Sequence, residues 1–340
     1  MSVTRLLFTV AEVAYLAATL MFAVHYASGK KRFRVVAISF LIGGVLSQAL
    51  FVGWRWVEGA RPPFANTFET LVFFSMAIAV TCIFVELLYS PKIVGAGASL
   101  VALLTLAYAN LFDWGIEPLM PALQNNLWLT LHVIFCFVSY ASFAVSYVVA
   151  LIFLLRHGGI LRKLSAFVTS LSVVGFVGGL VYGLGRKNEV FSTITGWNIA
   201  RVAAGGVVGA GLISVALVSI LNRKRVTAEG KGCVLSNLVS RTIAFGFPFL
   251  TLGIITGSVW ANVAWGRYWG WDPKETWSLI TWVVYAFFLH VRFSGGWLGL
   301  KAKSVPQLQA ILSVVGFLFV LFTYFGVNYL LAGLHTYTGQ

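Results

Sequence analysis

Long apolar stretches alternate with short polar segments along the whole chain. A helix needs roughly 20 apolar residues to cross the hydrocarbon layer of a membrane. About ten stretches meet this length: residues 6–27, 34–54, 68–89, 93–112, 127–155, 166–185, 198–221, 236–263, 275–293 and 306–332. The pattern predicts an all-α fold, a polytopic bundle of transmembrane helices. Because the polar connections are short, the bundle is expected to form a single domain over residues 1–340.

The overall composition indicates the same fold class. Hydrophobic residues make up 59% of the 340 residues, charged residues make up 10%, and the mean hydropathy is +0.89. This balance excludes a soluble domain. Residues 6–24 lack a small-residue cleavage pattern and lead directly into a second apolar stretch. We therefore interpret them as a retained helix in the lipid bilayer and not as a signal peptide.

Charge and cysteine content exclude two further classes of function. The net charge is +14, but the cations lie in short clusters between apolar stretches. That distribution is typical of topology signals, so no nucleic acid is expected as a partner. Cys82, Cys136 and Cys233 are far apart and form no CxxC motif. We predict that they act as small apolar residues and that this chain performs no thiol–disulfide chemistry of its own.

The basic residues also predict how the chain is oriented. Most of the 24 Lys and Arg residues lie in alternate connections, including residues 30–34 and 223–231. The positive-inside rule places these connections in the cytoplasm. Both termini are then expected outside, together with the connection over residues 260–277. An even number of spans agrees with this orientation.

The most unusual stretch is residues 260–277, with the sequence WANVAWGRYWGWDPKETW. It contains five of the 12 tryptophans, and Arg267, Asp272, Lys274 and Glu275 lie among them. One interpretation is an aromatic belt at the membrane interface, where Trp is common. The other is a platform for a large flat ligand with charged edges, in which Gly266 and Gly270 let the backbone bend. We favour the platform, because a belt needs only scattered rings.

The first outer connection, RWVEGARPPFANTFET, carries a helix start signal. Pro62 and Pro63 favour an extended approach to the helix. Asn66 or Thr67 is then expected to cap it, with Glu69 or Thr70 in its first turn.

Two of the five histidines are expected at the depth of the Trp-rich stretch. His132 lies near the outer start of one span, and His335 follows the outer end of the last. Either alone could be an ordinary interfacial residue. Together they could bind one metal axially, as in an iron porphyrin, which is flat and whose propionates attract cations such as Arg267 and Lys274. A zinc site is less apt, because no third histidine is near and no His-x-x-x-His spacing occurs.

The remaining histidines differ in depth. His290 lies about four turns into the span after the Trp-rich stretch, towards the inner side. It is either a functional group within the membrane or a polar residue beside Arg292 that reaches the interface. His25 ends the first span and is interpreted as structural, and His157 is expected to face solvent.

The sequence WGRYWGWD, followed by DPKETW, resembles the Trp-rich WWD signature of haem-handling proteins in cytochrome c assembly. That superfamily includes the CcmC, CcmF and CcsA (ResC) proteins. Further stretches resemble the CcsA family in particular: RPPFANTFET, NNLWLTLHVIFCFVSYASFA, FGFPFLTLGIITGSVWANVAWG, SLITWVVYAFFLHVR and GFLFVLFTYFGVNYLLAGLHTY. The resemblance covers most of residues 60–156 and nearly all of residues 234–338.

The resemblance implies a role in a bacterial inner membrane. CcsA proteins act with CcsB (ResB) as the System II cytochrome c synthase, a haem lyase. The complex carries haem b from the cytoplasmic side to an outer WWD site that faces the periplasm. There the vinyl groups form thioethers with the CxxCH cysteines of apocytochrome c. These thiols must be reduced, which implies a thioredoxin-like reducing partner.

The same resemblance implies roles for individual residues. His132 and His335 match the two axial ligands of the outer haem, and His290 matches an inner haem ligand whose partner comes from CcsB. The haem ring would be held by the residues of the signature: Trp265, Trp269, Trp271, Arg267 and Lys274. Asp272 either anchors Arg267 or a Trp N–H or helps to protonate a vinyl carbon. We favour the anchor.

One segment departs from the family pattern. Residues 157–233, with the Gly-rich stretches 166–185 and 198–221, lie between two family-like regions and are interpreted as a two-span insertion. The prediction is thus eight family-like spans and two inserted spans. Two extra spans leave the orientation of all residues after the insertion unchanged. Two alternatives stay open: a CcmC-like haem exporter that forms no thioether, and a secondary transporter, although no convincing internal repeat supports the latter.

Overall fold

The computed structural model describes residues 3–91, 93–116, 126–157, 229–294 and 304–331. These residues form helices and connections, with no strand among them. The helices are α1 (Val3–Ser28), α2 (Lys31–Gly59), α3 (Thr67–Tyr89), α4 (Val94–Ala109), α5 (Asn126–His157), α8 (Glu229–Trp265), α9 (Pro273–Ser294), α10 (Val305–Leu321) and α11 (Val327–Leu330). A π-helical turn, Phe322–Gly326, joins α10 to α11. The predicted all-α polytopic bundle is therefore confirmed.

The long helices coincide with the predicted spans within the described residues. Seven of these helices are long and apolar enough to cross a membrane, counting α10 together with its π-helical turn. The eighth apolar helix, α4, has 16 residues and measures about 24 Å at 1.5 Å per residue. It is shorter than the predicted stretch 93–112, because regular helix ends at Ala109. The predicted spans 166–185 and 198–221, and with them nearly all of the proposed insertion, lie outside the described residues.

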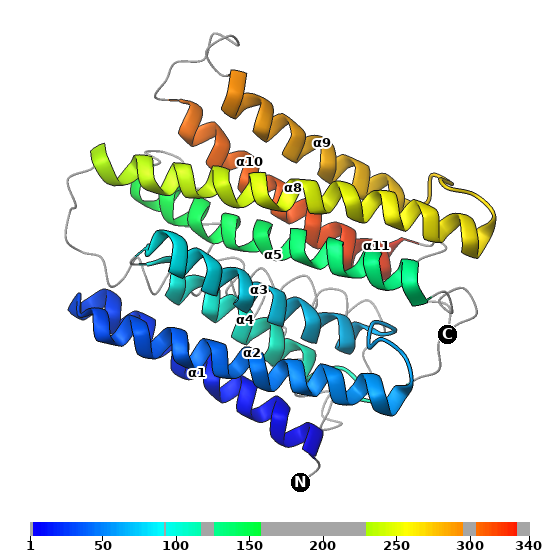
Figure 1. Ribbon diagram of the computed structural model, residues 1–340. Helices are drawn as coiled ribbons and strands as arrows, with labels where there is room; N and C mark the ends of the chain where they lie inside the picture. The colour runs from blue at the N-terminus through cyan, green and yellow to red at the C-terminus, as the bar shows by residue number, and fades with distance from the viewer. Residues whose placement is uncertain (1–2, 92, 117–125, 158–228, 295–303, 332–340) are drawn as a thin grey trace, which may run out of the picture.

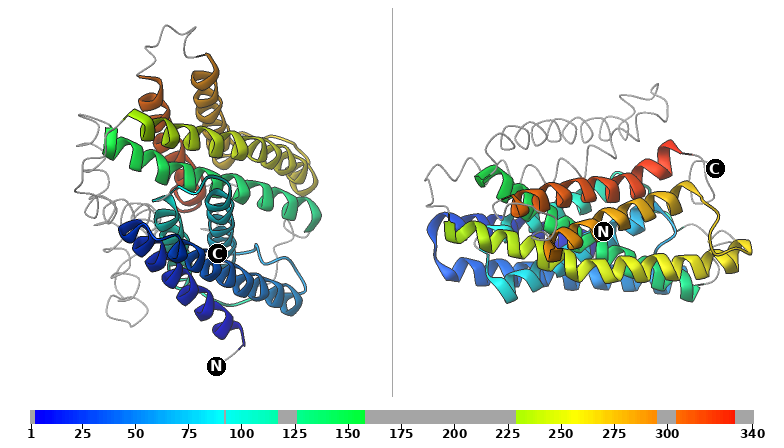
Figure 2. Two further views of the ribbon diagram at one scale, coloured as in Figure 1. Left: turned by 60° about the vertical axis from the view of Figure 1, so that its left-hand side comes forward. Right: turned by 90° about the horizontal axis from the view of Figure 1, so that it is seen from above.

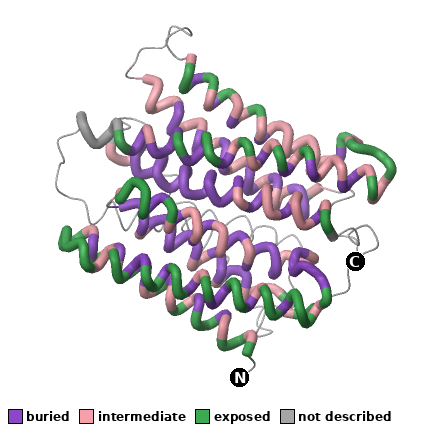
Figure 3. The backbone as a smooth tube through the Cα atoms, in the orientation of Figure 1, coloured by how far each residue is buried: buried purple, intermediate pink, exposed green. Residues whose placement is uncertain are grey.

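The described helices form two groups that meet at the centre of the bundle (Figures 1 and 2). α1 to α4 form one group, and α5, α8, α9 and α10 form the other. α3 and α10 both pack on α5. Most side chains of α5 are buried, whereas α1 and α2 expose many apolar side chains on their outward faces (Figure 3). That exposure is expected for helices that face lipid.

Glycines let α8 approach α5 closely. A Cβ atom on Gly246 would lie 2.9 Å from Ser142 Cβ, and one on Gly253 would lie 2.7 Å from Cys136 Sγ. Small residues at a helix interface permit such contacts between membrane helices. The spacing of seven residues keeps both glycines on one face of α8. This contact places the C-terminal part of α8 beside His132.

A buried carboxylate fastens the connection between α2 and α3, residues 60–66. Asn66 Oδ1 accepts the Glu69 backbone N–H at 2.9 Å, which confirms Asn66 as the cap of α3 and Glu69 as a first-turn residue. The Glu69 side chain accepts from Arg55 and Arg61, each at 2.9 Å, and from the Ala65 backbone N–H at 2.8 Å. All three charged side chains are at most 7% exposed. This cluster therefore joins α2, the connection and α3.

Candidate functional site

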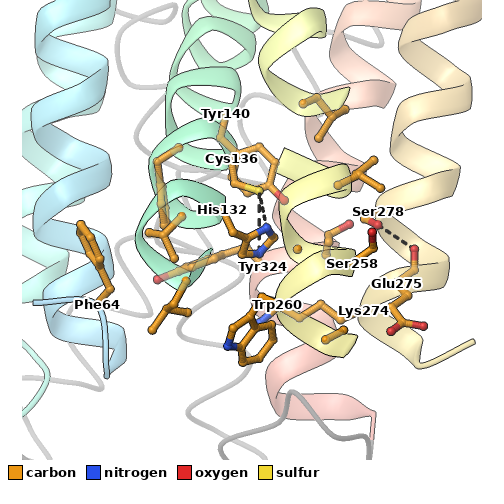
Figure 4. Close-up of a pocket in the computed structure, with 18 of the residues that line it drawn as sticks. Phe64, His132, Cys136, Tyr140, Ser258, Trp260, Lys274, Glu275, Ser278 and Tyr324 are labelled. Carbon is orange, nitrogen blue, oxygen red and sulfur yellow. Dashed lines mark hydrogen bonds between the residues drawn. The ribbon is translucent and has the colours of Figure 1, made fainter. Parts of the chain in front are cut away.

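A cavity of about 190 Å³ lies at the end of the bundle where α5, α8 and α9 meet the π-helical turn (Figure 4). Most of its wall is apolar or aromatic. The connection between α2 and α3 reaches it through Phe64, and α3 reaches it through Thr70. Segments far apart in sequence thus build one site, and part of the Trp-rich stretch lines it.

His132 lies on this cavity and has a fixed ring orientation. Its Nδ1 lies 2.7 Å from the Gly253 carbonyl oxygen on α8, so Nδ1–H donates and the lone pair is on Nε2. A Cβ atom on Gly257 would lie 2.6 Å from the same Nδ1. The imidazole is therefore packed directly against α8. Such a hydrogen bond to one ring nitrogen is the usual way in which proteins orient a metal-binding histidine.

Two tryptophans of the predicted platform, Trp265 and Trp269, line the same cavity as His132. Trp265 also packs edge-on against Trp260, with ring centroids 4.8 Å apart. Gly266 has φ +74° and ends α8, with its N–H bonded to the Asn262 carbonyl at 2.8 Å. This left-handed residue turns the chain back over the cavity.

Two other predicted platform residues lie outside the cavity lining. Trp271 is 69% exposed, and its ring meets that of Trp269 edge-on at 5.8 Å. Arg267 is exposed, and its guanidinium packs on the backbone of Gly270, where a Cβ atom would lie 2.6 Å from Nε. Both residues belong to the outer surface of the 266–272 connection.

Asp272 and Glu275 organise the start of α9. Asp272 is buried, and its Oδ2 accepts the Lys274 backbone N–H at 3.2 Å. Glu275 Oε2 accepts the backbone N–H of Asp272 at 3.1 Å and that of Gly270 at 2.7 Å. Glu275 thus makes the return bond of a capping box to Asp272, while Asp272 caps the second helical residue, Lys274. Asp272 thus contacts a backbone N–H group at the start of α9, whereas the sequence predicts Arg267 or a Trp N–H as its partner.

Lys274 brings a positive charge to the cavity. Its Nζ lies 3.0 Å from Asn328 Oδ1 on α11, and its side chain is half-buried. The cavity thus combines one imidazole, aromatic walls and an ammonium group. These features suit a flat aromatic ligand that carries a metal at its centre and anionic groups at its edge.

The other predicted histidines lie elsewhere. His290 is exposed on α9, far from the cavity. His25 is buried, with Nδ1 3.0 Å from the Lys30 carbonyl oxygen, as expected for a structural residue. His335 lies outside the described residues.

Several cavity residues were not singled out from the sequence. Cys136 and Tyr140 follow His132 at intervals of four along α5, so all three share one helix face (Figure 4). That spacing could have identified them. Thr70 and Tyr324 also line the cavity, and their hydroxyl oxygens lie 2.6 Å apart. Their contact joins positions 254 residues apart, and no local pattern predicts it.

The donor set of the described residues does not favour a metal bound by protein side chains alone. Within the described part of the chain, no three His, Cys, Asp or Glu residues are grouped as metal ligands. A metal at His132 would therefore need most of its ligands from elsewhere. A macrocycle supplies four such ligands in one plane, which fits the aromatic walls.

Comparison with known proteins gives one consistent result. Residues 64–335 match the family described as Cytochrome C assembly protein. The chain is 38% identical over 301 residues to the cytochrome c biogenesis protein CcsA of Synechocystis sp., covering 86% of this chain and 84% of the relative. It is 37% identical over 296 residues to CcsA of Synechococcus elongatus, with the same coverage of both chains.

A solved structure shares the fold. The structure titled Cytochrome c Heme Lyase CcmF superposes with a TM-score of 0.54 at 15% identity. The match covers 95% of this chain but 47% of that protein. At this identity the likeness concerns the arrangement of helices only.

Proposed function

The chain belongs to the cytochrome c assembly protein family, is an integral membrane protein and acts in cytochrome c maturation, and from this premise we propose that it presents haem b to apocytochrome c. In this proposal the chain is the CcsA subunit of a System II cytochrome c synthase in a bacterial inner membrane. A CcsB-type subunit completes the complex, and a thioredoxin-like protein keeps the acceptor thiols reduced. The cavity beside the Trp-rich stretch faces the periplasm.

The observation that carries this proposal is the shared position of His132, Trp269 and Lys274 on one cavity. Haem is the substrate that combines their chemistries. Its iron accepts an imidazole nitrogen, its ring packs on aromatic side chains and its propionates pair with a cation. His132 Nε2 would bind the iron from α5, with His335 as the second axial ligand.

The chain's own residues would mainly orient the substrate. Thioether formation requires each vinyl group to lie beside a cysteine sulfur, so positioning supplies much of the rate. Trp265 and Trp269 would hold the ring, and Lys274 would hold a propionate. Asp272 would keep Lys274 in place by capping α9. The histidine of the CxxCH sequence would then displace one axial ligand.

His290 is proposed as half of an inner haem site. It lies 16 residues after Lys274 on the same helix, about 24 Å along the axis. Its side chain is exposed on α9, so a second subunit could reach it. An ionisable side chain exposed within a membrane segment is costly unless it has a function or a partner.

The proposed function is tested by purifying the chain together with its CcsB-type partner and recording the absorption spectrum. We expect a Soret band with the α and β bands of six-coordinate, bis-histidine haem. Holocytochrome formation in cells carrying both subunits separates a synthase from a haem exporter. A preparation without a Soret band would contradict the proposal and favour the transporter.

Gly257→Ala is expected to weaken outer haem binding about tenfold. The added Cβ would lie 2.6 Å from His132 Nδ1 and 2.7 Å from Cε1, so the imidazole must move. Haem titration of the purified complex measures the change. Gly43→Ala is the matched control, because a Cβ there meets nothing within 4 Å. Equal haem affinity in the two variants would show that the ring position is unimportant.

His290→Ala is expected to lower the haem that copurifies with the two-subunit complex by about half, since one of two sites is lost. The pyridine haemochrome assay measures haem per complex. Phe287→Ala, an exposed residue one turn earlier on α9, is the control and should retain full haem content. Undiminished haem in His290→Ala would remove the assigned role.

A further inference from the structure

Trp271 has a backbone conformation that is rare for its residue type. Its φ is +56°, in the left-handed region, where bulky side chains are strained. Within the described residues, the other non-glycine positions with positive φ are Ala60 and Ser90, which end α2 and α3. Trp271 ends no helix. Strain of this kind persists only where the surrounding structure enforces it, and it concentrates at functional sites.

The structure contains the group that enforces this conformation. Glu275 Oε2 accepts the backbone N–H groups of Gly270 at 2.7 Å and Asp272 at 3.1 Å, the residues on either side of Trp271. One carboxylate oxygen therefore holds both neighbours. Asp272 is buried and caps α9, so the clamp is attached to a rigid helix. The result is a large ring held away from the protein, 69% exposed.

Three roles are conceivable for the Trp271 ring, and its position distinguishes between them. It does not line the cavity, so it is not part of the wall around the substrate. A ring of an interfacial belt needs neither a strained backbone nor a carboxylate clamp, as Trp54 on regular helix α2 illustrates with 51% exposure. The third use is contact with a molecule that approaches the cavity from outside. Trp271 meets Trp269 edge-on, and Trp269 lines the cavity, so that molecule would lie next to the bound substrate.

We propose that Trp271 is a contact residue for the acceptor polypeptide and that Glu275 is its positioning residue. This inference rests on the proposed function, because haem attachment is the step that requires a polypeptide at the cavity. Exposed Trp is a frequent anchor in protein interfaces. Cysteine sulfurs pack well against aromatic rings, so a CxxCH segment has suitable chemistry. Fixing the ring before binding avoids the entropy cost of ordering it later.

The test uses the full-length chain, purified with its partner subunit and loaded with haem. The probe is a synthetic CxxCH peptide whose thiols are methylated, which keeps both sulfurs and prevents thioether formation. Trp271→Ala is expected to lower peptide affinity about tenfold. Trp54→Ala, the matched exposed ring at the same end of the bundle, should leave affinity unchanged. Equal affinity of Trp271→Ala and wild type would overturn the contact.

A photo-crosslinking residue at position 271 identifies what the ring touches. The expected product is an adduct with the peptide. An adduct with lipid alone would overturn the inference in favour of an interfacial belt. Absence of haem from the wild-type complex would contradict the proposed function itself. Bound haem with peptide affinity independent of Trp271 would contradict this inference only.

Two further variants separate positioning from folding. Trp271→Gly removes the ring and relieves the strain at φ +56°, so we expect a thermal stability at or above wild type together with the same loss of peptide affinity. Glu275→Ala should lower peptide affinity, whereas Glu275→Gln should retain most of it, because the amide oxygen still accepts both N–H groups. Unchanged affinity in Glu275→Ala would overturn its positioning role.

Discussion

His132→Ala is expected to abolish holocytochrome formation and to remove the six-coordinate haem spectrum of the outer site. Removing a group that only orients a metal ligand lowers metal affinity about 10- to 100-fold. Removing the ligand itself should therefore lower haem affinity at the outer site at least about tenfold. The imidazole is held by Gly253 and enclosed by Gly257, so the variant leaves a space shaped for it. Added imidazole should therefore restore part of the haem signal. Spectra with and without imidazole, together with cytochrome c yield, measure the effect.

The control for His132→Ala is Val133→Ala. Val133 lines the same cavity from the same helix but offers no ligand atom. It should retain the haem spectrum with a modest loss of stability. Immunoblotting of membranes shows whether each variant accumulates. Normal cytochrome c yield in His132→Ala would contradict axial ligation from α5.

The helices were predictable because the membrane imposes a simple rule. Each span must satisfy its backbone hydrogen bonds within the helix and be apolar over its length. A long apolar stretch in the sequence therefore identifies a span. α5 and α9 therefore begin within two residues of the predicted positions. α8 begins at Glu229, before the predicted residue 236, because a helix can continue beyond the apolar layer. Apolarity alone does not define where α4 ends.

The site was predictable only in part. The position of a residue within its span gives its depth in the membrane. The sequence therefore assigned His132, Trp269 and Lys274 to one level of the membrane. The direction of each ring depends on backbone geometry that no periodicity encodes. Trp269 lines the cavity and Trp271 faces outward because the Glu275 clamp rotates the chain between them.

Contacts between distant segments were also beyond prediction. The sequence placed Phe64 and Thr70 in or next to the first outer connection, but it gave no reason to bring them to the His132 cavity. The buried cluster around Glu69 explains their position, since it fixes the connection that carries Phe64 and the helix start that carries Thr70. The same cluster supports the second prediction with a large effect.

Glu69→Gln is expected to lower the free energy of unfolding by about 3–5 kcal/mol, because it leaves two buried guanidinium groups without their carboxylate. Arg55 also donates to the Trp114 and Gly115 carbonyls, so the disturbance should extend to the residues that follow α4. Thermal unfolding in detergent measures the loss. Glu58→Gln, an exposed residue of α2, should change stability by less than about 0.5 kcal/mol.

The cluster holds two cations and one anion, so the variants should not be equivalent. Arg61→Gln leaves one buried Arg55–Glu69 pair, balanced in charge, and should cost less than Glu69→Gln. In the double variant Glu69→Gln/Arg61→Gln, the Arg61 substitution removes a cation that Glu69→Gln alone leaves unpaired. The double variant should therefore be more stable than the sum of the two single losses predicts. Additive losses would show that Glu69 contributes through its bond to the Ala65 backbone N–H and not through charge.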